Sequence, residues 1–311
     1  MKFSDRLNYW FISISLGALA ILPLRALYVI SDVVRWVVYD LARYRRRVVE
    51  DNLRTSFPEK DESWVRSTGR RFYSWLVDYM FETVKMARMS DDEIRRRMRI
   101  RNPEMVNDAV GHGRSVALYL GHYCNWEWVS SLPLSFVPEA MSCQVYHPLH
   151  NKGMDRYFDK LRTRFGARNI AMDDIMRQLV EWKREGRCSV TGFIADQAPG
   201  INVHLWLDFL HHDTGVYTGP ERIARFLDAV CLYCHMSRPR RGYYELTFVP
   251  VTFEPKKEEK FDITRKYFRL LEANISEHPE FWLWSHRRWK RTREDFNRYW
   301  GDKASHQLTH L

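Results

Sequence analysis

The chain has 311 residues, of which 45% are hydrophobic and 14% aromatic, and its formal net charge is +10. A chain of this length and composition can bury a large core, which excludes an intrinsically disordered protein, and its mean hydropathy of -0.48 excludes a protein with several membrane spans. The positive charge predicts an anionic partner: nucleic acid, a lipid surface, a phosphorylated substrate or an acidic protein.

The first forty residues form an apolar segment followed by arginines. Residues 10–24 are mostly apolar, Pro23 and Arg25 interrupt the pattern, and residues 26–30 continue it. This is short for a bilayer span, which needs about 20 residues, and no cleavage site of a signal peptide follows. We favour an uncleaved membrane anchor that spans the bilayer or lies in its interface, with a buried core helix as the alternative. The basic run 43–47 would place the rest of the chain in the cytoplasm.

Further along the chain, helical patterning changes to an alternation of strands and helices. Residues 46–90 are helical in pattern, with apolar positions three and four apart over 63–86, and the sheet begins near residues 98–103. The predicted strands are 115–120, 140–146, 169–171, 188–194, 229–236 and 243–253, and the predicted helices begin near 126 and cover 154–165, 173–185, 219–227 and 264–278. Such alternation predicts an α/β fold with a mostly parallel central sheet flanked by helices, and with strand 243–253 antiparallel at its edge.

The most informative segment is the one that follows strand 115–120. Gly121 lets the backbone turn, and Asn125 can cap a helix that begins near residue 126. This places His122 at the carboxyl end of a buried strand, where open α/β sheets bind their ligands. A carboxylate at Glu127 would orient the imidazole and make it a better base, which predicts deprotonation of a hydroxyl during acyl transfer.

The spacing of this motif is weak evidence without its structural context, because a chain with 12 histidines and 39 acidic residues repeats it by chance. It does recur, from His150 to Asp155. That copy lies in a loop that contains Pro148 and Gly153 and lacks a strand, turn and helix around it. We interpret the second copy as chance or loop structure.

Cysteine and histidine patterns predict neither a disulfide framework nor a bound group. The odd count of five cysteines fits reduced cytosolic thiols. Cys231, Cys234 and His235 match the pattern for covalent haem attachment, but they lie in a predicted buried strand, so we expect core cysteines. The cluster 211–213, His-His-Asp, has no partner at a ligand-like spacing. We therefore expect no cofactor and no metal.

Several segments together resemble one family: the late acyltransferases of lipid A biosynthesis, of the lauroyl and myristoyl type, within the lysophospholipid acyltransferase superfamily. The resemblance spans roughly residues 46–294. Its motifs, in chain order, are Asn52-Leu53, Phe57-Pro58, the segment 121–127, Tyr146-His147-Pro148, Arg162-Thr163-Arg164, Ala195-Asp196-Gln197, Gly219-Pro220, His278-Pro279-Glu280 and residues 284–290. The chain departs from the family at Phe209-Leu210-His211, where the family has Phe-Phe-Gly, and this bears on the expected acyl pocket.

The resemblance implies transfer of a fatty acyl chain from acyl carrier protein to a hydroxyl of a lipid A precursor, at the cytoplasmic face of the bacterial inner membrane. His122 would take the proton of the hydroxyl, and Glu127 would stabilise the imidazolium that forms. Direct transfer needs no acyl-enzyme, so Cys124 is not expected to be a nucleophile. We accordingly divide the chain into a membrane anchor at 1–40, an acyltransferase domain at 41–295 and a C-terminal tail at 296–311.

Further side chains are expected to bind substrate. Asp196 and Gln197 end an apolar strand and should line the cleft. Arg162 and Arg164 do not share a helix face, so one can bind a phosphate while the other pairs on the surface, and we favour Arg164. The segment 281–290, with arginines among tryptophans, suits a surface that binds phosphates at a membrane interface.

Two rival functions remain open at this stage. One is an O-acyltransferase that acts on a lysophospholipid or an aminolipid. The other is a membrane-surface binding protein without catalytic activity. Aromatic and basic residues together would also suit single-stranded nucleic acid, but the apolar N-terminal segment favours a membrane, and we expect no nucleic acid partner.

Overall fold

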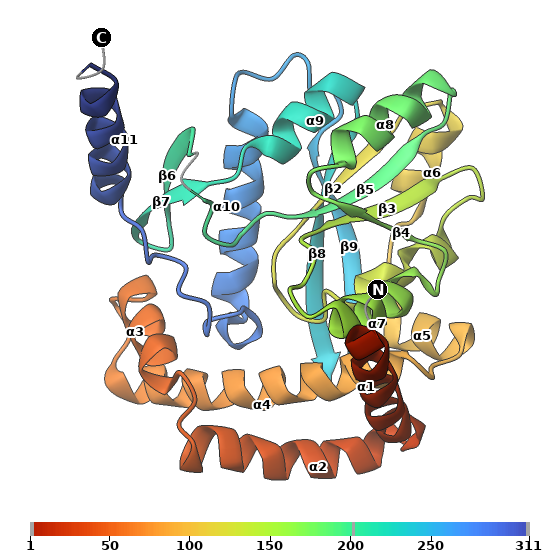
Figure 1. The fold of residues 1–311 in the computed structure, drawn as a ribbon, viewed down its shortest axis with the longest axis vertical. Coiled ribbons are helices and arrows are strands. Elements are labelled where there is room, and N and C mark those ends of the chain that lie inside the picture. The colour runs from red at the N-terminus through yellow and green to blue at the C-terminus, as the bar shows by residue number, and fades with distance from the viewer. Residues whose placement is uncertain (1–2, 201–202, 309–311) are drawn as a thin grey trace.

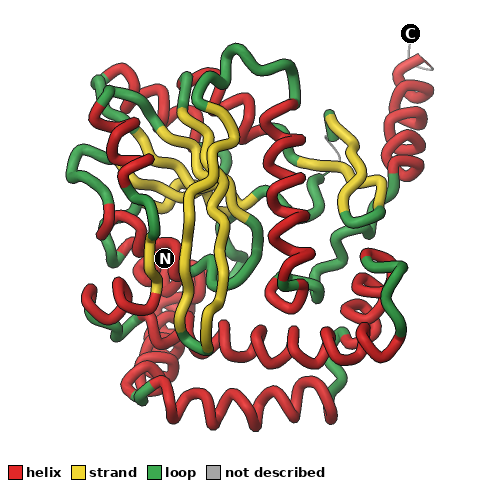
Figure 2. Tube along the Cα trace, turned by 180° about the vertical axis from the view of Figure 1, so that it is seen from behind, coloured by secondary structure: helices red, strands yellow, loops and turns green. Residues whose placement is uncertain are grey.

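The computed structural model describes residues 3–200 and 203–308 and confirms the α/β fold. The ends of the predicted anchor and tail, residues 1–2 and 309–311, lie outside the described residues. A seven-stranded sheet forms the centre of the molecule, with helices around it (Figures 1 and 2).

The central sheet is mostly parallel, with the strand order β1-β9-β8-β2-β5-β3-β4. Its strands are β1 (Met98–Ile100), β2 (Val116–Leu120), β3 (Met141–Tyr146), β4 (Arg168–Ala171), β5 (Ser189–Ile194), β8 (Val230–Arg240) and β9 (Tyr243–Thr252). Every residue of β2 is buried, as its run of apolar side chains predicts for an interior parallel strand. Among the described strand pairs of this central sheet, only β8–β9 is antiparallel.

Helices surround the sheet and continue below it. They are α1 (Phe3–Ile21), α2 (Leu24–Trp36), α3 (Arg46–Ser56), α4 (Glu62–Met86), α5 (Asp91–Arg97), α6 (Glu104–Gly111), α7 (Lys152–Thr163), α8 (Ile175–Arg184), α9 (Gly219–Leu227), α10 (Asp262–Glu277) and α11 (Arg293–Leu308), with a π-helical turn at Val37–Leu41. Helix α10 packs along β8 and β9, and α6 and α9 pack against β2. Helices α2 and α4 run side by side beneath the end of the β8–β9 hairpin (Figures 1 and 2).

The N-terminal segment forms two helices that Pro23 separates. The pair α1 and the helical stretch from Leu24 to Leu41 is bent by 113°. Among the described residues, no single helix is long and apolar enough to cross a bilayer. Only this bent pair has the required length and apolar composition, and only when its two parts are taken together. Helix α1 packs on α7, and α2 packs on α4. Anchoring to a membrane stays a prediction, as does the division of the chain at residues 40 and 295.

Several local predictions were wrong or incomplete. The segment after Asn125 is a 3₁₀ helix, η2 (Trp128–Ser135), because Pro133 removes a backbone donor that an α-helix needs. Strand β9 is antiparallel to β8 as predicted, but it is not at the edge, since β1 pairs with it in parallel. Helix α11 begins at Arg293 and contains residues 296–308 of the predicted tail.

A second sheet of two strands, β6 (Leu205–Phe209) and β7 (His212–Val216), was missed. Its two-residue turn, Leu210 and His211, has φ angles of 53° and 61°. Such turns usually carry Asn or Gly, the residues that most readily adopt the left-handed region, so the sequence lacks the usual hairpin signal. The backbone NH of Leu210 donates to Glu272 of α10 at 2.7 Å, which holds this turn against the main body.

Candidate active site

Sheet register brings His122 and Asp196 together. Leu120 at the end of β2 pairs with Ile194 at the end of β5. His122 and Asp196 each follow two residues after this pair. The imidazole Nδ1 of His122 lies 2.6 Å from Oδ1 of Asp196, and the backbone NH of His122 donates to Oδ2 at 2.8 Å. The two residues therefore meet at the carboxyl ends of neighbouring parallel strands, the edge where α/β sheets bind ligands.

Asp196 is buried, and its environment favours the charged form. Burial alone raises the pKa of this carboxyl group, but the charge and hydrogen bonds of His122 outweigh that effect, and the indole of Trp282 adds a hydrogen bond at 2.8 Å. The net result is a lowered pKa. Asp196 is thus a carboxylate that accepts hydrogen bonds, which assigns the proton of the imidazole to Nδ1.

The other ring nitrogen of His122 is left as an acceptor. The side-chain amide of Gln197 lies with Nε2 3.1 Å from Nε2 of His122, as a donor to an unprotonated nitrogen would. The ring of Trp126 packs edge-on against the imidazole with its centroid 5.2 Å away. His122 is therefore held in the tautomer that can accept a proton at Nε2.

Gly121 is required by close packing behind this pair. A Cβ atom at this position would lie 2.6 Å from Cδ1 of Leu271 on α10 and 3.4 Å from Oδ2 of Asp196. A side chain here would push α10 or the carboxylate away. The sequence interpretation of Gly121 as a turn residue is thus incomplete, because the glycine also lets α10 approach the catalytic edge.

Glu127 does not occupy the position that the spacing predicted. Among the described hydrogen bonds, its carboxylate binds Arg162 of α7, with distances of 2.8 Å from Nε and 2.5 Å from Nη2, and none joins it to His122. Glu127 follows the turn at 123–126 and precedes η2, so its side chain is directed toward α7 while Asp196 takes the imidazole. The expected His122–Glu127 contact is therefore corrected to a His122–Asp196 contact.

The Glu127–Arg162 pair is a largely buried, bidentate ion pair next to the catalytic turn. The Glu127 side chain is 4% exposed and that of Arg162 is 23% exposed. Burial lowers the pKa of Arg162, but the hydrogen bond and charge of Glu127 reverse this and leave the pKa raised. Arg162 therefore stays charged and keeps part of its surface open.

Arg164, the arginine that we favoured for substrate binding, has a different position. Its guanidinium donates to the backbone carbonyl of Met86, the last residue of α4, and, at 2.7 Å, to that of Met89, three residues beyond the helix. Helix α7 ends at Thr163, so Arg164 leaves the helix in another direction from Arg162. Arg162, and not Arg164, lies beside the His122–Glu127 segment.

The aromatic and basic segment 281–290 is mainly core, which corrects the expected phosphate-binding surface. Trp282 and Trp284 are buried, and Arg288 is only 3% exposed, with its Nη2 donating to the carbonyl of Gly215 at 2.8 Å. Burial lowers the pKa of Arg288 to about 10. In this segment Arg287 and Lys290 are the exposed residues. Alternating tryptophans signal burial as readily as a membrane interface, and composition alone did not separate the two.

This segment also completes the site. Ala198, next to Gln197, donates its backbone NH to Nε2 of His286 at 3.3 Å, and burial lowers the pKa of His286 to about 4. The family motif at Asn52 is explained by its side chain, which donates to the carbonyls of Trp284 and His286. Both motifs belong to the family resemblance, but their contact with the loop after β5 was not predicted.

Cys124 is two residues from His122 but cannot serve as an acyl carrier. Its side chain is fully buried, and burial raises the pKa of the thiol well above its ordinary value. A nucleophilic thiol needs the opposite shift. Cys231 and Cys234 of β8 are buried as predicted, and burial raises the pKa of each thiol.

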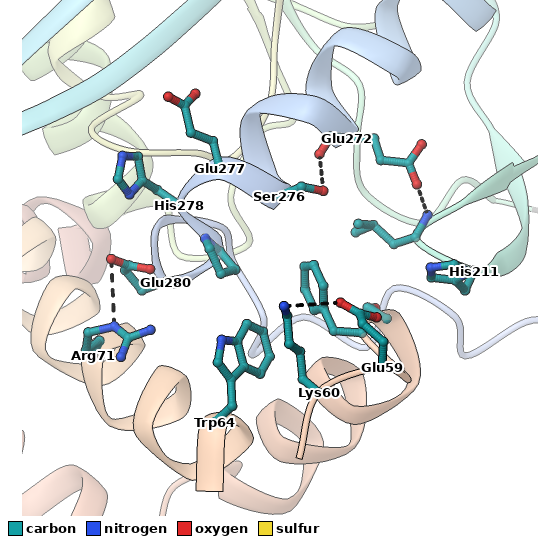
Figure 3. A pocket seen from close by; sticks show the side chains of 14 residues that line it. Glu59, Lys60, Trp64, Arg71, His211, Glu272, Ser276, Glu277, His278 and Glu280 are labelled. Atoms are coloured by element: carbon teal, nitrogen blue, oxygen red, sulfur yellow. Dashed lines mark hydrogen bonds and ion pairs between the residues drawn. The ribbon is translucent and has the colours of Figure 1, made fainter. Parts of the chain in front are cut away.

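Two pockets flank the segment 281–290. One, of about 520 Å³, lies between the start of α4 and the end of α10 (Figure 3). Its charged side chains are largely paired with one another: Arg71 lies 3.8 Å from Glu280, and Lys60 lies 3.7 Å from Glu59. The other, of about 340 Å³, begins at Ala198 and is lined by aromatic rings and by Arg288. The lining of the second pocket begins one residue after Gln197 and includes neither His122 nor Asp196.

Comparison with known proteins gives a family match over most of the chain. Residues 2–291 match the family described as bacterial lipid A biosynthesis acyltransferase. Lipid A biosynthesis acyltransferase 2 of Shigella flexneri is 23% identical to this chain over 297 residues, which cover 89% of this chain and 88% of that protein. The match includes the whole central sheet and every residue described above at the site.

Proposed function

Because the chain belongs to the bacterial lipid A biosynthesis acyltransferases, and is thus an acyltransferase, we propose that His122 is its general base and that Asp196 orients it. The single observation that carries this proposal is the 2.6 Å contact between Nδ1 of His122 and Oδ1 of Asp196, which leaves Nε2 unprotonated. An acceptor hydroxyl would take the place of the Gln197 amide, which lies 3.1 Å from Nε2. Both the motif after strand 115–120 and the family resemblance pointed to Glu127 for this role.

The reaction follows from this arrangement. Nε2 of His122 takes the proton of an acceptor hydroxyl, and the oxygen attacks the carbonyl carbon of an acyl thioester. An ester C–O bond forms, the C–S bond breaks, and the departing thiolate recovers the proton from the imidazolium. Asp196 stabilises that imidazolium through the bond to Nδ1, as a carboxylate does in other His-dependent acyl transfers. Base catalysis supplies about 10²- to 10⁴-fold, so substrate positioning must supply the rest.

We place the acceptor near Arg162 and the acyl chain beyond Gln197. Arg162 stays charged and partly exposed, which suits a phosphate group of a lipid A precursor. The pocket of about 340 Å³ that begins at Ala198 is lined by rings such as Trp206 and Phe296 and suits an apolar chain. Asp196 and Gln197 then act on the imidazole, and their earlier assignment to substrate binding is replaced by an orienting role.

We propose that α1 and α2 lie in the membrane interface and bring the site to its lipid acceptor. Their exposed apolar side chains fall on one face of each helix: Phe3, Leu7, Trp10, Phe11 and Ile14 on α1, and Val29, Val33 and Trp36 on α2. The opposite faces pack on α7 and α4. Helices that are apolar outward as well as inward suit an interfacial position better than bulk water. The location would be the cytoplasmic face of the inner membrane.

The proposed donor is acylated acyl carrier protein. The net charge of +10 favours a strongly acidic carrier over a neutral donor, because opposite charge accelerates encounter. Neither the +10 charge nor the site identifies the acceptor hydroxyl or the acyl chain length, so both enter the test as variables.

The test is mass spectrometry of the products after carrier protein loaded with several chain lengths is offered to a panel of lipids. The panel contains a lipid A precursor, a lysophospholipid and an aminolipid. We expect an ester on the lipid A precursor, no product with His122→Ala, and a nearly unchanged rate with His150→Ala, whose side chain is exposed in a loop. Product on another acceptor only would replace the proposed substrate, and full cellular function of His122→Ala would favour a non-catalytic binding protein.

A further inference from the structure

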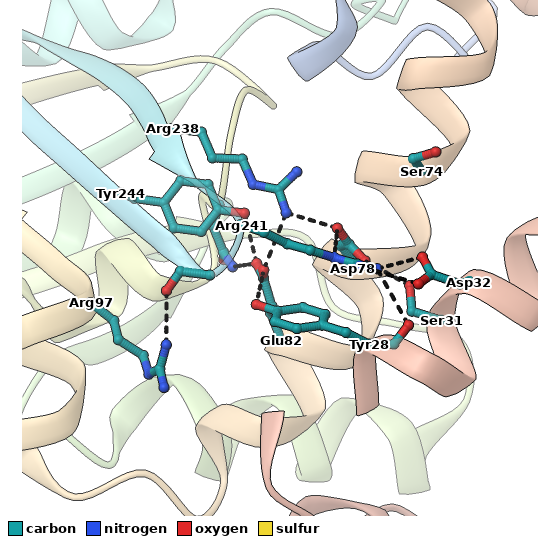
Figure 4. Close-up of polar contacts among 12 residues, drawn as sticks. Tyr28, Ser31, Asp32, Ser74, Asp78, Glu82, Arg97, Arg238, Arg241 and Tyr244 are labelled. Atoms are coloured by element: carbon teal, nitrogen blue, oxygen red, sulfur yellow. Dashed lines mark hydrogen bonds and ion pairs between the residues drawn. The ribbon is translucent and has the colours of Figure 1, made fainter. Parts of the chain in front are cut away.

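Helix α4 carries two buried carboxylates, Asp78 and Glu82, one helical turn apart below the catalytic edge of the sheet. Burying two carboxylates on one helix face is costly unless both are paired and hydrogen-bonded. Arg238 at the end of β8 and Arg241 in the turn after it point toward them, as Figure 4 shows.

The two arginines serve mainly Asp78. Arg241 donates to it from Nε at 2.8 Å and from Nη2 at 2.5 Å, and Arg238 donates from Nη2 at 2.8 Å. The nearest approach of Arg238 to Glu82 is 3.7 Å, which is beyond hydrogen-bond distance. Glu82 therefore depends on other donors.

Those donors are three neutral side chains from three parts of the fold. The hydroxyl of Tyr28, on α2, donates to Oε1 of Glu82 at 2.8 Å. The hydroxyl of Tyr244, on β9, and the side-chain amide of Asn125 donate to Oε2 at 2.7 Å and 2.8 Å. One carboxylate thus joins an N-terminal helix to the turn between His122 and Glu127.

Asn125 connects Glu82 to the turn between His122 and Glu127. Its side-chain oxygen accepts the backbone NH of Trp128 at 3.1 Å, and the indole of Trp128 donates to the backbone carbonyl of Glu82 at 3.1 Å. The residue before Asn125 is Cys124, whose φ of 51° is in the left-handed region that side chains with a Cβ avoid. A strained turn persists only where its surroundings fix it, and Glu82 supplies two of the fixing contacts.

We propose that Glu82 is a positioning residue for acyl transfer. Through Asn125 and Trp128 it holds the strained turn that separates His122 from Glu127, and Tyr28 of α2 completes the hydrogen bonding of its carboxylate. Through Tyr28 alone, α2 is then linked to the turn after His122, in addition to its place in the proposed membrane-facing surface. This inference rests on the proposed role of His122.

The test measures kcat and KM of the full chain in detergent micelles with saturating acceptor, so that recruitment to a membrane does not limit the rate. Glu82→Gln keeps the shape of the side chain but replaces one accepting carboxylate oxygen with an amide NH₂ group. That group is itself a donor and faces the donors Tyr28, Tyr244 and Asn125. We expect kcat to fall about tenfold or more with KM within about twofold, because small misplacement of a catalytic group acts on turnover. Tyr28→Phe should lower kcat in the same way but less, by about threefold or more.

A matched control is Ser31→Ala on the same helix. Ser31 donates to Asp78 at 2.7 Å and has no hydrogen bond to Glu82 among those of the described residues. Its loss should lower the Tm as Tyr28→Phe does while kcat stays within about twofold of wild type. An equal loss of kcat in Ser31→Ala and Tyr28→Phe would overturn the inference, since it would mean that any loosening of α2 slows the enzyme.

A double variant separates positioning from general destabilisation. If Glu82 acts through Asn125, Glu82→Gln combined with Asn125→Ala should be no more than about twofold slower than the slower single variant. If the fold loss of kcat in the double variant equals the product of the two single losses, Glu82 and Asn125 act independently, which would contradict the inference. Activity in His122→Ala would refute the proposed function itself, whereas an inactive His122→Ala with an unchanged kcat in Glu82→Gln would refute this inference alone.

Discussion

Nδ1 of His122 lies 2.6 Å from Oδ1 of Asp196, two residues whose side chains follow neighbouring parallel strands and are 74 positions apart in the chain. The same carboxylate also accepts the backbone NH of His122 and the indole NH of Trp282. Asp196 therefore fixes both the ring and the backbone of the histidine. The imidazole and the carboxylate that binds it are thus assembled across the sheet and not along one turn.

The Glu127–Arg162 ion pair should matter for stability as well as for activity. Glu127→Gln leaves a largely buried arginine without its charged partner, and removing one member of such a pair costs about 3–5 kcal/mol. We expect a clearly lower Tm together with a lower kcat. The measurement is thermal unfolding alongside turnover.

Replacing both members of that pair distinguishes the two effects. Glu127→Gln combined with Arg162→Met removes the unpaired charge and should recover much of the Tm, because apolar replacements of buried pairs are often tolerated. Activity should stay low if Arg162 binds the acceptor phosphate. Recovery of kcat together with Tm would show that the pair has only a structural role.

Membrane attachment should depend on the outward faces of α1 and α2. Val33→Asp places a charge on the exposed side of α2 without touching the buried residues that face α4, and we expect a weaker association with anionic vesicles. Deletion of the whole segment is a poorer test, since it would also remove Tyr28 from Glu82. Co-sedimentation with vesicles measures the effect.

The matched control for this substitution is Phe253→Asp. Phe253 is also exposed but follows β9, at the end of the sheet away from α2. It should leave vesicle binding unchanged. Equal losses in the two variants would argue against a specific interfacial face, and accessibility of the catalytic domain to protease from the periplasmic side of intact cells would refute the proposed topology.

The proposed donor predicts a strong effect of salt. Attraction between this chain and an acidic carrier protein is screened over a Debye length of about 8 Å at physiological ionic strength, so the KM for the acylated carrier should rise with salt. Arg287→Glu, near the site, should raise that KM more than it lowers kcat, whereas Arg177→Glu on α8 should change little.

Acyl-coenzyme A provides the comparison, since it presents far less negative surface. It should be the poorer donor and the less sensitive to salt. If acyl-coenzyme A gives an equal or higher kcat/KM across the salt series, an acyltransferase of the phospholipid type becomes the better description.

Acid should destabilise the protein through His286. Its pKa is lowered by burial to about 4 from a usual value near 6.5, so the unfolded chain binds more protons between these values. Stability therefore falls as the pH drops through this window, and protonation also removes the acceptor for the NH of Ala198. His286→Gln should flatten the dependence of Tm on pH by a few degrees, and His150→Gln in the exposed loop should not. If the dependence of Tm on pH were unchanged in His286→Gln, His286 would not be the group that destabilises the protein in acid.

Much of the fold could be predicted from the sequence because its signals are local. The buried run of β2, the helical pattern over 63–86 and the alternation that follows β2 are set by apolar periodicity, which determines element type and sheet class. The hairpin β6–β7 gave no such signal, since Leu210 and His211 occupy a turn that usually carries Asn and Gly. Its conformation depends on Glu272 of α10, which no local pattern encodes.

The sequence places the residues of the candidate site at strand ends but does not predict which of them pair. His122, Asp196 and Gln197 were each placed at strand ends, and two strands that neighbour each other in the sheet would bring them together. Strand order is not local information, so the nearer carboxylate, Glu127, was paired with the histidine instead. Arg288 was misplaced for the opposite reason: arginine is usually a surface residue, and its burial depends on the carbonyl of Gly215.

The most direct test of the central claim is the single-turnover rate of acyl transfer by Asp196→Asn. The substitution keeps the size of the side chain but removes the carboxylate that holds the proton on Nδ1 of His122. The rate should fall about 10²- to 10⁴-fold, the range expected when a catalytic histidine loses its tautomer and its counter-charge. A rate within tenfold of wild type in a folded Asp196→Asn protein would contradict the account.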